Sequence, residues 1–352
     1  MHVAGLPVLP EADLAHAFRA VGEADWRSLA GARIFLTGGT GFVGKWLMAT
    51  LLDADRRLGL GCELVVLSRD PEAFAATAPG LARAPRVTLM RGDVRDFAFP
   101  AGAFTHVVHA ATDVVAQNSP QATFATCVEG TRHALDFAAR SGAQDFLLVS
   151  SGAVYGRQPP SLERVDESFA GAPDPLSPSS AYGEGKRVSE WLGAALGAES
   201  RMRFKVARCF AFVGPYLPLD KQFAIGNFLR DAMAGKQITI QGDGTPYRTY
   251  LHAADMAAWL WATLLRGQPG RAYNVGGHEA VSIADLARRT VAALGSPARV
   301  AVLKEAPPGR PAERYVPDIA RARAELALPD PISLDEALVR TARWHRDFPL
   351  ST

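Results

Sequence analysis

Tyr182 and Lys186 stand four residues apart in the stretch AYGEGKR. In a helix this spacing places both side chains on one face. A free phenol, whose pKa is about 10, is a poor base at neutral pH, but a neighbouring cation favours the phenolate form. The pair is therefore a candidate acid/base for moving a proton to or from a substrate oxygen.

Two serine hydroxyls end the apolar run DFLLVSS upstream of this pair, at Ser150 and Ser151. The carboxyl end of a buried parallel strand is where ligands of such folds bind. Either hydroxyl could hydrogen-bond a substrate hydroxyl or carbonyl, and Ser151 is the candidate. The alternative is a role in a turn or a helix cap, which applies more to Ser150.

A glycine-rich turn, TGGTGFVG, follows the apolar run RIFLT and opens a helical pattern. Glycines in this setting allow a tight turn and let backbone N–H groups approach a pyrophosphate, while the helix N-terminus adds partial positive charge. The alternative is a turn without a ligand. We expect dinucleotide contacts from Gly38, Gly41, Phe42, Val43 and Gly44.

The end of the second strand, VVLSRD, bears on the choice between NAD and NADP. An acid there binds the ribose 2′-hydroxyl, whereas an arginine accommodates a 2′-phosphate. Ser68 occupies the acid position and Arg69 follows it, which favours NADP(H) over NAD(H). Two alternatives stay open: Asp70 could reach the ribose, and Arg69 could be a solvated loop residue.

Further cofactor contacts are expected after the third and fourth strands. Asp93, in RGDV, stands where a contact to the adenine edge is expected, although a helix-capping role explains it equally well. The other residues expected at the cofactor are Val94, Ala110 and Ala111.

The elements that must position these residues alternate between short apolar runs and helical patterns. Runs such as LVVL and FLLV are apolar at consecutive positions, which indicates strands buried on both faces of a parallel sheet. Helices are expected over 123–140 and 181–196, and a strand over 204–212. The pattern predicts an α/β fold with a doubly wound parallel sheet of the Rossmann type.

Three regions are expected along the chain. Residues 1–30 form an N-terminal helical extension with a helix over 10–21, and residues 31–213 form the dinucleotide-binding domain. Residues 214–352 form a smaller, mixed α/β substrate lobe from which elements can return to the core. A proline-rich stretch of irregular pattern, 157–179, interrupts the large domain and is typical of a functional loop.

Composition excludes several function classes. The 38 basic and 36 acidic residues leave a net charge of +2, too balanced for non-specific nucleic-acid binding. No apolar run is long enough to span a bilayer, and the sequence predicts a cytoplasmic protein. No metal site is expected, because His106, His109 and His252 lack metal-ligand spacing and the three cysteines form no CxxC pair.

The motifs TGGTGFVG, SSGAVYG and YGEGK, in this order and spacing, resemble those of the extended short-chain dehydrogenase/reductases, specifically the NAD(P)-dependent nucleotide-sugar epimerase/dehydratase group. The resemblance covers residues 33–346 and includes RCFAFVGP, FAIGNF, GDGTPYRTYLHAADMA and YNVGG. It implies that Tyr182 is the acid/base, that Lys186 holds the nicotinamide ribose and tunes Tyr182, and that Ser151 completes the triad.

The resemblance also implies a nucleotide-diphosphate sugar as substrate and a homodimer. Arg248 would clamp the diphosphate, for which a guanidinium is well suited. Asn227 and one of Arg310 or Arg314 would add nucleotide contacts.

Departures from the family pattern narrow the expected reaction. Dehydratases of this group carry Asp-Glu after the triad hydroxyl and decarboxylases carry a glutamate there, whereas this sequence has Gly152 and Ala153. Cys127 and Ala211 replace two asparagines usual in the family, and the second change puts a substrate contact in doubt.

What remains is hydride transfer at a sugar carbinol or ketone. A 4-keto-6-deoxyhexose reductase using NADP(H) is favoured. The alternatives are a 4-epimerase with tightly bound NAD, a 4,6-dehydratase, a reductase of a non-sugar carbonyl compound and a non-enzymatic redox-sensing protein; the intact Tyr182 and Lys186 argue against the last of these.

Overall fold

The computed structural model of the protein describes residues 9–112 and 119–348. Within them, seven strands form a central sheet in the order β11-β6-β5-β4-β1-β2-β3, and every neighbouring pair is parallel. Their bounds are β1 Arg33–Thr37, β2 Glu63–Ser68, β3 Val87–Arg91, β4 His106–His109, β5 Asp145–Ser151, β6 Arg203–Cys209 and β11 Ala272–Val275.

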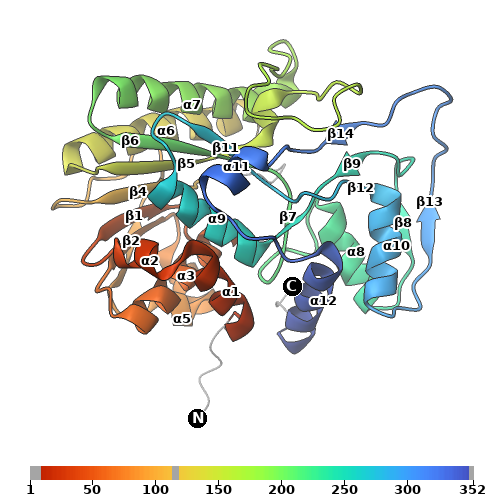
Figure 1. Ribbon diagram of the computed structural model, residues 1–352, viewed down its shortest axis with the longest axis horizontal. Helices are drawn as coiled ribbons and strands as arrows, with labels where there is room; N and C mark the ends of the chain where they lie inside the picture. The colour runs from red at the N-terminus through yellow and green to blue at the C-terminus, as the bar shows by residue number, and fades with distance from the viewer. Residues whose placement is uncertain (1–8, 113–118, 349–352) are drawn as a thin grey trace.

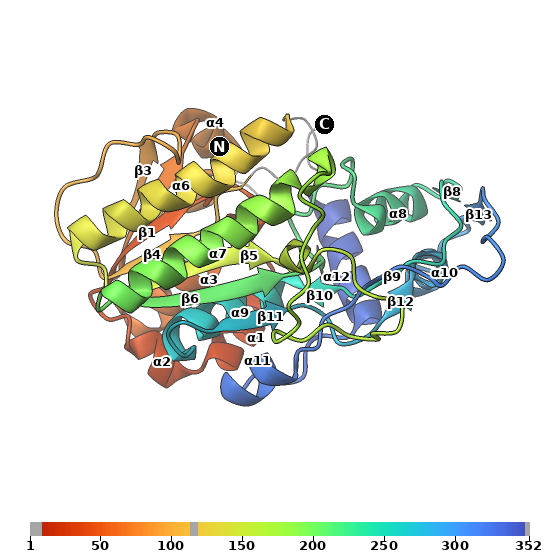
Figure 2. The same ribbon diagram turned by 90° about the horizontal axis from the view of Figure 1, so that it is seen from above.

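Helices cover both faces of this sheet (Figure 1). On one face α6 (Pro120–Ser141) and α7 (Ala181–Glu199) lie side by side (Figure 2). On the other, α3 (Phe42–Leu58) packs against α9 (Ala253–Arg266), and α1 (Glu11–Val21) packs on both. The doubly wound fold predicted from the sequence is confirmed. Shorter helices, α2 (Glu23–Arg27), α4 (Pro71–Thr77) and α5 (Pro79–Ala82), connect elements at the β1–β3 side.

The strands form where the sequence supplies continuous apolar runs. All seven residues of β5 are buried, because helices cover both faces of a parallel sheet. Ser119 starts α6 by accepting a hydrogen bond from the Ala122 N–H, and Asp70 starts α4 in the same way through Ala73, each satisfying an amide that the helix leaves free.

One predicted strand is wrong in extent. The strand expected over 204–212 ends at Cys209, which pairs with Ser151, the last residue of β5. Beyond that point the neighbouring strand has ended, so the chain changes partner. Phe212–Val213 form β7, which pairs with β10 (Leu251–His252).

Smaller elements form a second lobe, on the right of Figure 1. Its sheets are β8 (Ile238–Ile240) with β13 (Val300–Val302), and β9 (Tyr247–Arg248) between β12 (Val281–Ser282) and β14 (Arg314–Tyr315). Its helices are α8 (Ala224–Met233), α10 (Ile283–Ala293) and α12 (Leu334–Asp347), while α11 (Ala320–Glu325) lies against β11. The chain after residue 214 also returns α9 and β11 to the large sheet.

The irregular stretch after β5 contains two short 3₁₀ turns, Gly152–Tyr155 and Pro178–Ser180. Between them, residues 157–177 form no helix or strand beyond a bridge from Val165 to Pro317. This loop therefore reaches across to the segment that leaves the smaller lobe. Among the described residues no helix has the length and apolarity needed to cross a membrane.

Buried charges attach the N-terminal helix α1 to the rest of the molecule. The Asp13 side chain is 1% exposed and accepts a hydrogen bond from Arg340 of α12 at 2.7 Å. His16 lies 2.6 Å from the carboxylate of Asp255 on α9. Burial raises the pKa of Asp13, and its contact with Arg340 opposes that rise.

The Asp13–Arg340 pair gives a stability prediction. Arg340→Met leaves the Asp13 carboxylate buried without its cation, which we expect to lower the free energy of unfolding by about 3 kcal/mol. Urea unfolding followed by circular dichroism measures the change. Arg343→Met, at an exposed position of the same helix, is the control and should be near neutral; equal effects of the two variants would contradict the assignment.

Candidate active site

The glycine turn after β1 packs directly on the end of β4. Gly38 has a φ of +72°, and a Cβ there would lie 2.6 Å from the carbonyl carbon of Ala110. The Ala110 N–H donates to the Thr37 carbonyl at 3.2 Å, and the Ala111 N–H donates to the Thr37 hydroxyl at 3.1 Å. The structure thus brings together Gly38, Ala110 and Ala111, three of the residues predicted at the cofactor.

Gly41 and Gly44 have different environments within the same turn. A Cβ on Gly44 would lie 2.3 Å from the Gly38 carbonyl oxygen, so the turn itself requires glycine there. A Cβ on Gly41 would meet no described atom closer than the Gly38 oxygen at 3.4 Å. The packing of the chain does not explain why residue 41 is a glycine.

The surroundings of Gly41 leave room for a bound phosphate. Gly41 is the exposed residue that precedes α3, and no described side chain caps that helix. The first N–H groups of α3, beginning at Phe42 and Val43, are therefore available to a pyrophosphate, which the helix N-terminus attracts. These residues fit a nicotinamide dinucleotide of the Rossmann type.

Asp70, the acidic residue that follows β2, caps a helix. The Ser68 hydroxyl accepts from the Asp70 N–H at 3.2 Å, and Asp70 caps α4 by accepting from the Ala73 N–H at 3.0 Å. Arg69 is exposed. Asp93 pairs with Arg95 through hydrogen bonds of 2.8 and 3.0 Å and starts a turn rather than a helix. This pairing and the charge of Arg69 lower the pKa of Asp93.

The predicted triad residues converge at the carboxyl end of β5. Lys186, 3% exposed, donates from its ammonium to the Val149 carbonyl at 2.8 Å. Ser151 ends the same strand, and its hydroxyl accepts from the Ala153 N–H at 3.1 Å. Tyr182 is the second residue of α7, one turn before Lys186, and Ser151 acts to lower its pKa.

Tyr182 is a phenol rather than a phenolate in the chain alone. Burial raises its pKa, and the effect of Ser151 only partly opposes the rise. Burial also lowers the pKa of Lys186, whose ammonium is directed to the Val149 carbonyl. The prediction that Lys186, together with the positive nicotinamide of an oxidised cofactor, favours the phenolate stays a prediction.

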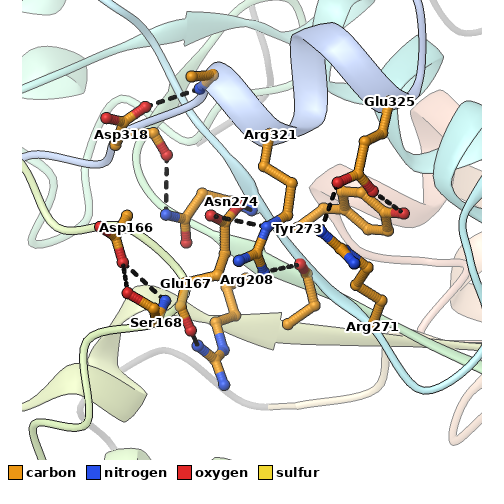
Figure 3. Close-up of polar contacts among 12 residues, drawn as sticks. Asp166, Glu167, Ser168, Arg208, Arg271, Tyr273, Asn274, Asp318, Arg321 and Glu325 are labelled. Atoms are coloured by element: carbon orange, nitrogen blue, oxygen red, sulfur yellow. Dashed lines mark hydrogen bonds and ion pairs between the residues drawn. The ribbon is translucent and has the colours of Figure 1, made fainter.

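Ser150 has a separate, structural role. Its hydroxyl donates to Glu190 of α7 at 2.6 Å, and Glu190 also pairs with Arg208 of β6 at 2.7 Å. Arg208 continues to the Glu167 carbonyl and the Tyr155 hydroxyl. Figure 3 shows Arg208 within the polar cluster that joins β6 and β11 to the segments around Glu167 and Arg321.

Tyr315 and Phe210 lie at this site and were missed in the sequence. A Cβ on Gly152 would lie 2.6 Å from the Phe210 ring and 2.8 Å from the Tyr315 hydroxyl. The two rings pack with their centroids 4.6 Å apart. No signal near Tyr315 in the chain pointed to it, since β14 comes from the smaller lobe.

The arginines predicted to bind the nucleotide have different surroundings in the structure. Arg248 faces the site: it is paired in register with Tyr315, and its guanidinium lies 5.8 Å from that ring. Arg314 lies over the Tyr247 ring at 4.6 Å, while exposed Arg310 approaches Glu313 at 3.7 Å.

Two further residues have roles within the chain. Asn227 of α8 donates to the Lys221 carbonyl at 2.9 Å.

His109 lies buried between the hydroxyls of Thr37 and Thr131 at 2.8 and 3.1 Å, and burial lowers its pKa to about 3. Among the described residues no cluster of His, Cys, Asp or Glu could hold a metal ion.

Comparison with known proteins agrees with this geometry. The family model described as the NAD dependent epimerase/dehydratase family matches residues 34–276. UDP-glucuronic acid decarboxylase 3 of Arabidopsis thaliana is 30% identical over 310 residues, 87% of this chain and 86% of its own length. The dTDP-glucose 4,6-dehydratase of Streptomyces griseus is 30% identical over 321 residues, 89% of this chain and 93% of its own.

Solved structures agree as well. DesIV, a dTDP-glucose 4,6-dehydratase from Streptomyces venezuelae solved with NAD and TYD bound, aligns with a TM-score of 0.74 and 25% identity over 90% of this chain and 97% of its own. UDP-glucose 4-epimerase from Thermotoga maritima aligns with a TM-score of 0.73 and 20% identity over 90% of this chain and 99% of its own, which supports the fold.

The contrast between two glycines predicts separable effects. Gly41→Ala should leave the melting temperature nearly unchanged, because the chain has room for the methyl group, yet weaken dinucleotide binding by at least about tenfold by blocking the pyrophosphate. Fluorescence titration with NADPH and NADH measures affinity. Gly44→Ala, the comparison variant, should instead destabilise the fold. Wild-type affinity in Gly41→Ala would exclude the assigned phosphate site.

Proposed function

Since the chain belongs to the NAD-dependent epimerase/dehydratase family, which confirms the resemblance seen in its motifs, we propose that it transfers hydride at C4 of a nucleotide-linked sugar. The form we favour is the reduction of a 4-keto-6-deoxyhexose. The observation that carries this proposal is the environment of Ser151. Gly152 follows it, and the space where a side chain would lie is filled by Phe210 and the Tyr315 hydroxyl.

This environment disfavours elimination and decarboxylation. The relatives named above as dehydratases and decarboxylases belong to groups in which an acidic residue follows the triad hydroxyl. Here an acidic side chain at position 152 would collide with two aromatic residues, and Ala153 carries no ionisable group. Proton transfer at neighbouring sugar carbons therefore lacks its usual acid and base, whereas carbonyl reduction needs only a donor at the oxygen.

Tyr182 is suited to be that donor. Its raised pKa keeps the phenol protonated at neutral pH, so it can donate its proton to the sugar oxygen as negative charge develops there. The Ser151 hydroxyl donates a hydrogen bond to the same oxygen. When bound, the nicotinamide cofactor supplies the hydride. The Lys186 ammonium, buried beside β5, provides positive charge near Tyr182.

Arg248 is proposed to hold the diphosphate of the substrate. It lies next to Tyr315 on β9, and its guanidinium can make two parallel hydrogen bonds to phosphate oxygens. Arg310 or Arg314 and Asn227 are proposed to add contacts to the nucleotide. Arg69 after β2 is proposed to accept the 2′-phosphate of NADP(H), because the position where an acid would bind the ribose hydroxyl is occupied by Ser68.

A 4-epimerase with bound NAD is the second candidate, and two comparisons favour it. The matching family model is described as NAD dependent, and DesIV was solved with NAD. Epimerisation uses the same residues twice, with Tyr182 first accepting and then returning the proton at the C4 oxygen. It too requires no acidic residue at position 152.

The cofactor that stays with the purified protein separates the two reactions. We expect no dinucleotide after gel filtration, and NADPH oxidation on addition of dTDP- or UDP-linked 4-keto-6-deoxyglucose. Absorbance and mass spectrometry of the released cofactor give its identity and stoichiometry. NAD retained at about one per subunit would instead support the epimerase. Failure of dTDP, UDP, GDP, ADP and CDP alike to raise the melting temperature would exclude a nucleotide-sugar substrate.

Removal of the Tyr182 hydroxyl tests the proton donor. Tyr182→Phe should reduce turnover by about 10² to 10⁴ because general acid catalysis is lost, while the affinity for the dinucleotide stays within about twofold, since the ring remains. Steady-state rates and fluorescence titration check both. Turnover equal to the wild type would remove Tyr182 from the mechanism.

A further inference from the structure

Four buried polar side chains near the candidate active site take no part in the proposed reaction. Thr37 ends β1 beside the glycine turn, and His109 ends β4. Thr131 lies on α6 and Ser189 on α7, the two helices that lie side by side over one face of the sheet (Figure 2). Each residue is at most 1% exposed. We call these four residues the His109 network.

Hydrogen bonds join the members of the His109 network without a break. The Thr37 Oγ1 lies 2.8 Å from the His109 Nδ1, and the His109 Nε2 lies 3.1 Å from the Thr131 Oγ1. The Thr131 hydroxyl lies 2.9 Å from the Ser189 hydroxyl. At the β1 end, the Ala111 N–H donates to the Thr37 hydroxyl at 3.1 Å. The network therefore begins where the structure places the candidate cofactor turn.

The other end of the network lies at the helical turn that carries the predicted acid/base. The Ser189 hydroxyl donates to the carbonyls of Gly185 and Cys127 at 2.8 and 2.9 Å. The two helices are in close contact here, because a Cβ on Gly185 would lie 2.7 Å from the Cβ of Cys127. Gly185 lies between Tyr182 and Lys186 in the chain. The network thus connects the end of β1 to that turn of α7.

The imidazole at the centre of the network is neutral. Burial lowers the pKa of His109 to about 3, and the ammonium of Lys186 acts in the same direction. A neutral imidazole has one N–H donor and one nitrogen that accepts. The ring can therefore link two hydroxyls only as a donor to one and an acceptor from the other.

The direction of each hydrogen bond follows from counting protons, because a hydroxyl donates one proton and a carbonyl oxygen only accepts. The Ser189 proton goes to a carbonyl, so Thr131 donates to Ser189. The Thr131 proton is then used, so the Nε2 of His109 carries a proton and donates to Thr131. The Nδ1 accepts from Thr37. Counting from the other end agrees, since Thr37 accepts from the Ala111 N–H and keeps its own proton for the ring.

We propose that His109 is a positioning residue: as the Nε2–H tautomer it links the end of β1 to α7 and holds Tyr182 and Lys186 in place relative to the dinucleotide. The expected effect on the rate rests on the proposed function, because only that reaction makes Tyr182 the proton donor. Hydrogen bonds that run in one direction polarise one another. Loss of one member leaves buried partners unsatisfied, so the connection acts as a unit.

Variants of Thr131 separate the hydrogen bonds from the packing. Thr131→Val keeps the shape of the side chain and removes the hydroxyl. We expect kcat to fall about tenfold, because a small displacement of Tyr182 is costly, while the affinity for the dinucleotide stays within about twofold. Thr131→Ser keeps the hydroxyl and should restore kcat to within about twofold of the wild type. Steady-state rates and fluorescence titration measure both quantities.

Thr290→Val is the matched control. Thr290 of α10 is equally buried, and its hydroxyl donates to the Leu286 carbonyl of its own helix at 2.8 Å. Removal of this hydroxyl should leave kcat unchanged, because Thr290 belongs to the smaller lobe and not to the His109 network. Equal rates in Thr131→Val and Thr131→Ser, or an equal loss in Thr290→Val, would overturn the inference.

Nuclear magnetic resonance of protein labelled with ¹⁵N-histidine reads the tautomer directly. At neutral pH we expect the Nε2 of His109 to be protonated and the Nδ1 to be bare. His109→Gln identifies the resonances by their loss, and Thr131→Val identifies them independently by shifting them. A proton on Nδ1, or on both nitrogens, would contradict the proposed arrangement.

Hydrogen exchange tests the positioning of α7 without any substrate. In Thr131→Val the amides of residues 181–190 should exchange faster than in the wild type, whereas those of α9 should not change. If this result and the tautomer are found but no nucleotide sugar is turned over, the proposed function fails and the inference stands. Unchanged exchange over 181–190 would refute the inference and leave the proposed function in place.

Discussion

The active site depends on one buried charge, the ammonium of Lys186. An ammonium 3% exposed must have a partner inside the protein, and the Val149 carbonyl two residues before Ser151 provides it at 2.8 Å. That contact fixes the first turns of α7 against the end of β5. Because Tyr182 lies one turn before Lys186, the same contact sets the position of the phenol relative to the Ser151 hydroxyl.

A second layer of polar contacts joins the strands of the large sheet behind this arrangement. Glu190, one turn after Lys186, joins Ser150 to Arg208, and the Tyr155 hydroxyl links Arg208 to Asn274. Since most of these groups are buried, each loss would leave a partner unsatisfied in a low-dielectric interior.

Short-range patterns in the sequence were sufficient for the fold and for part of the site. The turn glycines, and Tyr182 with Lys186, could be found because each motif is continuous and its spacing fixes its geometry. Tyr315 could not be found, because only the pairing of β14 with β9 brings it beside Gly152. The ionisation of Tyr182 was also beyond the sequence, since it depends on burial and on the direction of the Lys186 ammonium. The strand expected to reach residue 212 was too long, because its partner β5 ends at Ser151.

The path of the chain after residue 214 has a consequence for protein engineering. α9 packs against one face of the large sheet, and β11 forms the edge of that sheet beside β6. Both elements follow the first elements of the smaller lobe in sequence. A chimera that exchanged everything after β7 with a relative would replace part of the Rossmann core as well as the lobe. To transfer the substrate preference of a relative, one must therefore exchange the segments of the smaller lobe separately and keep α9 and β11 of the original chain.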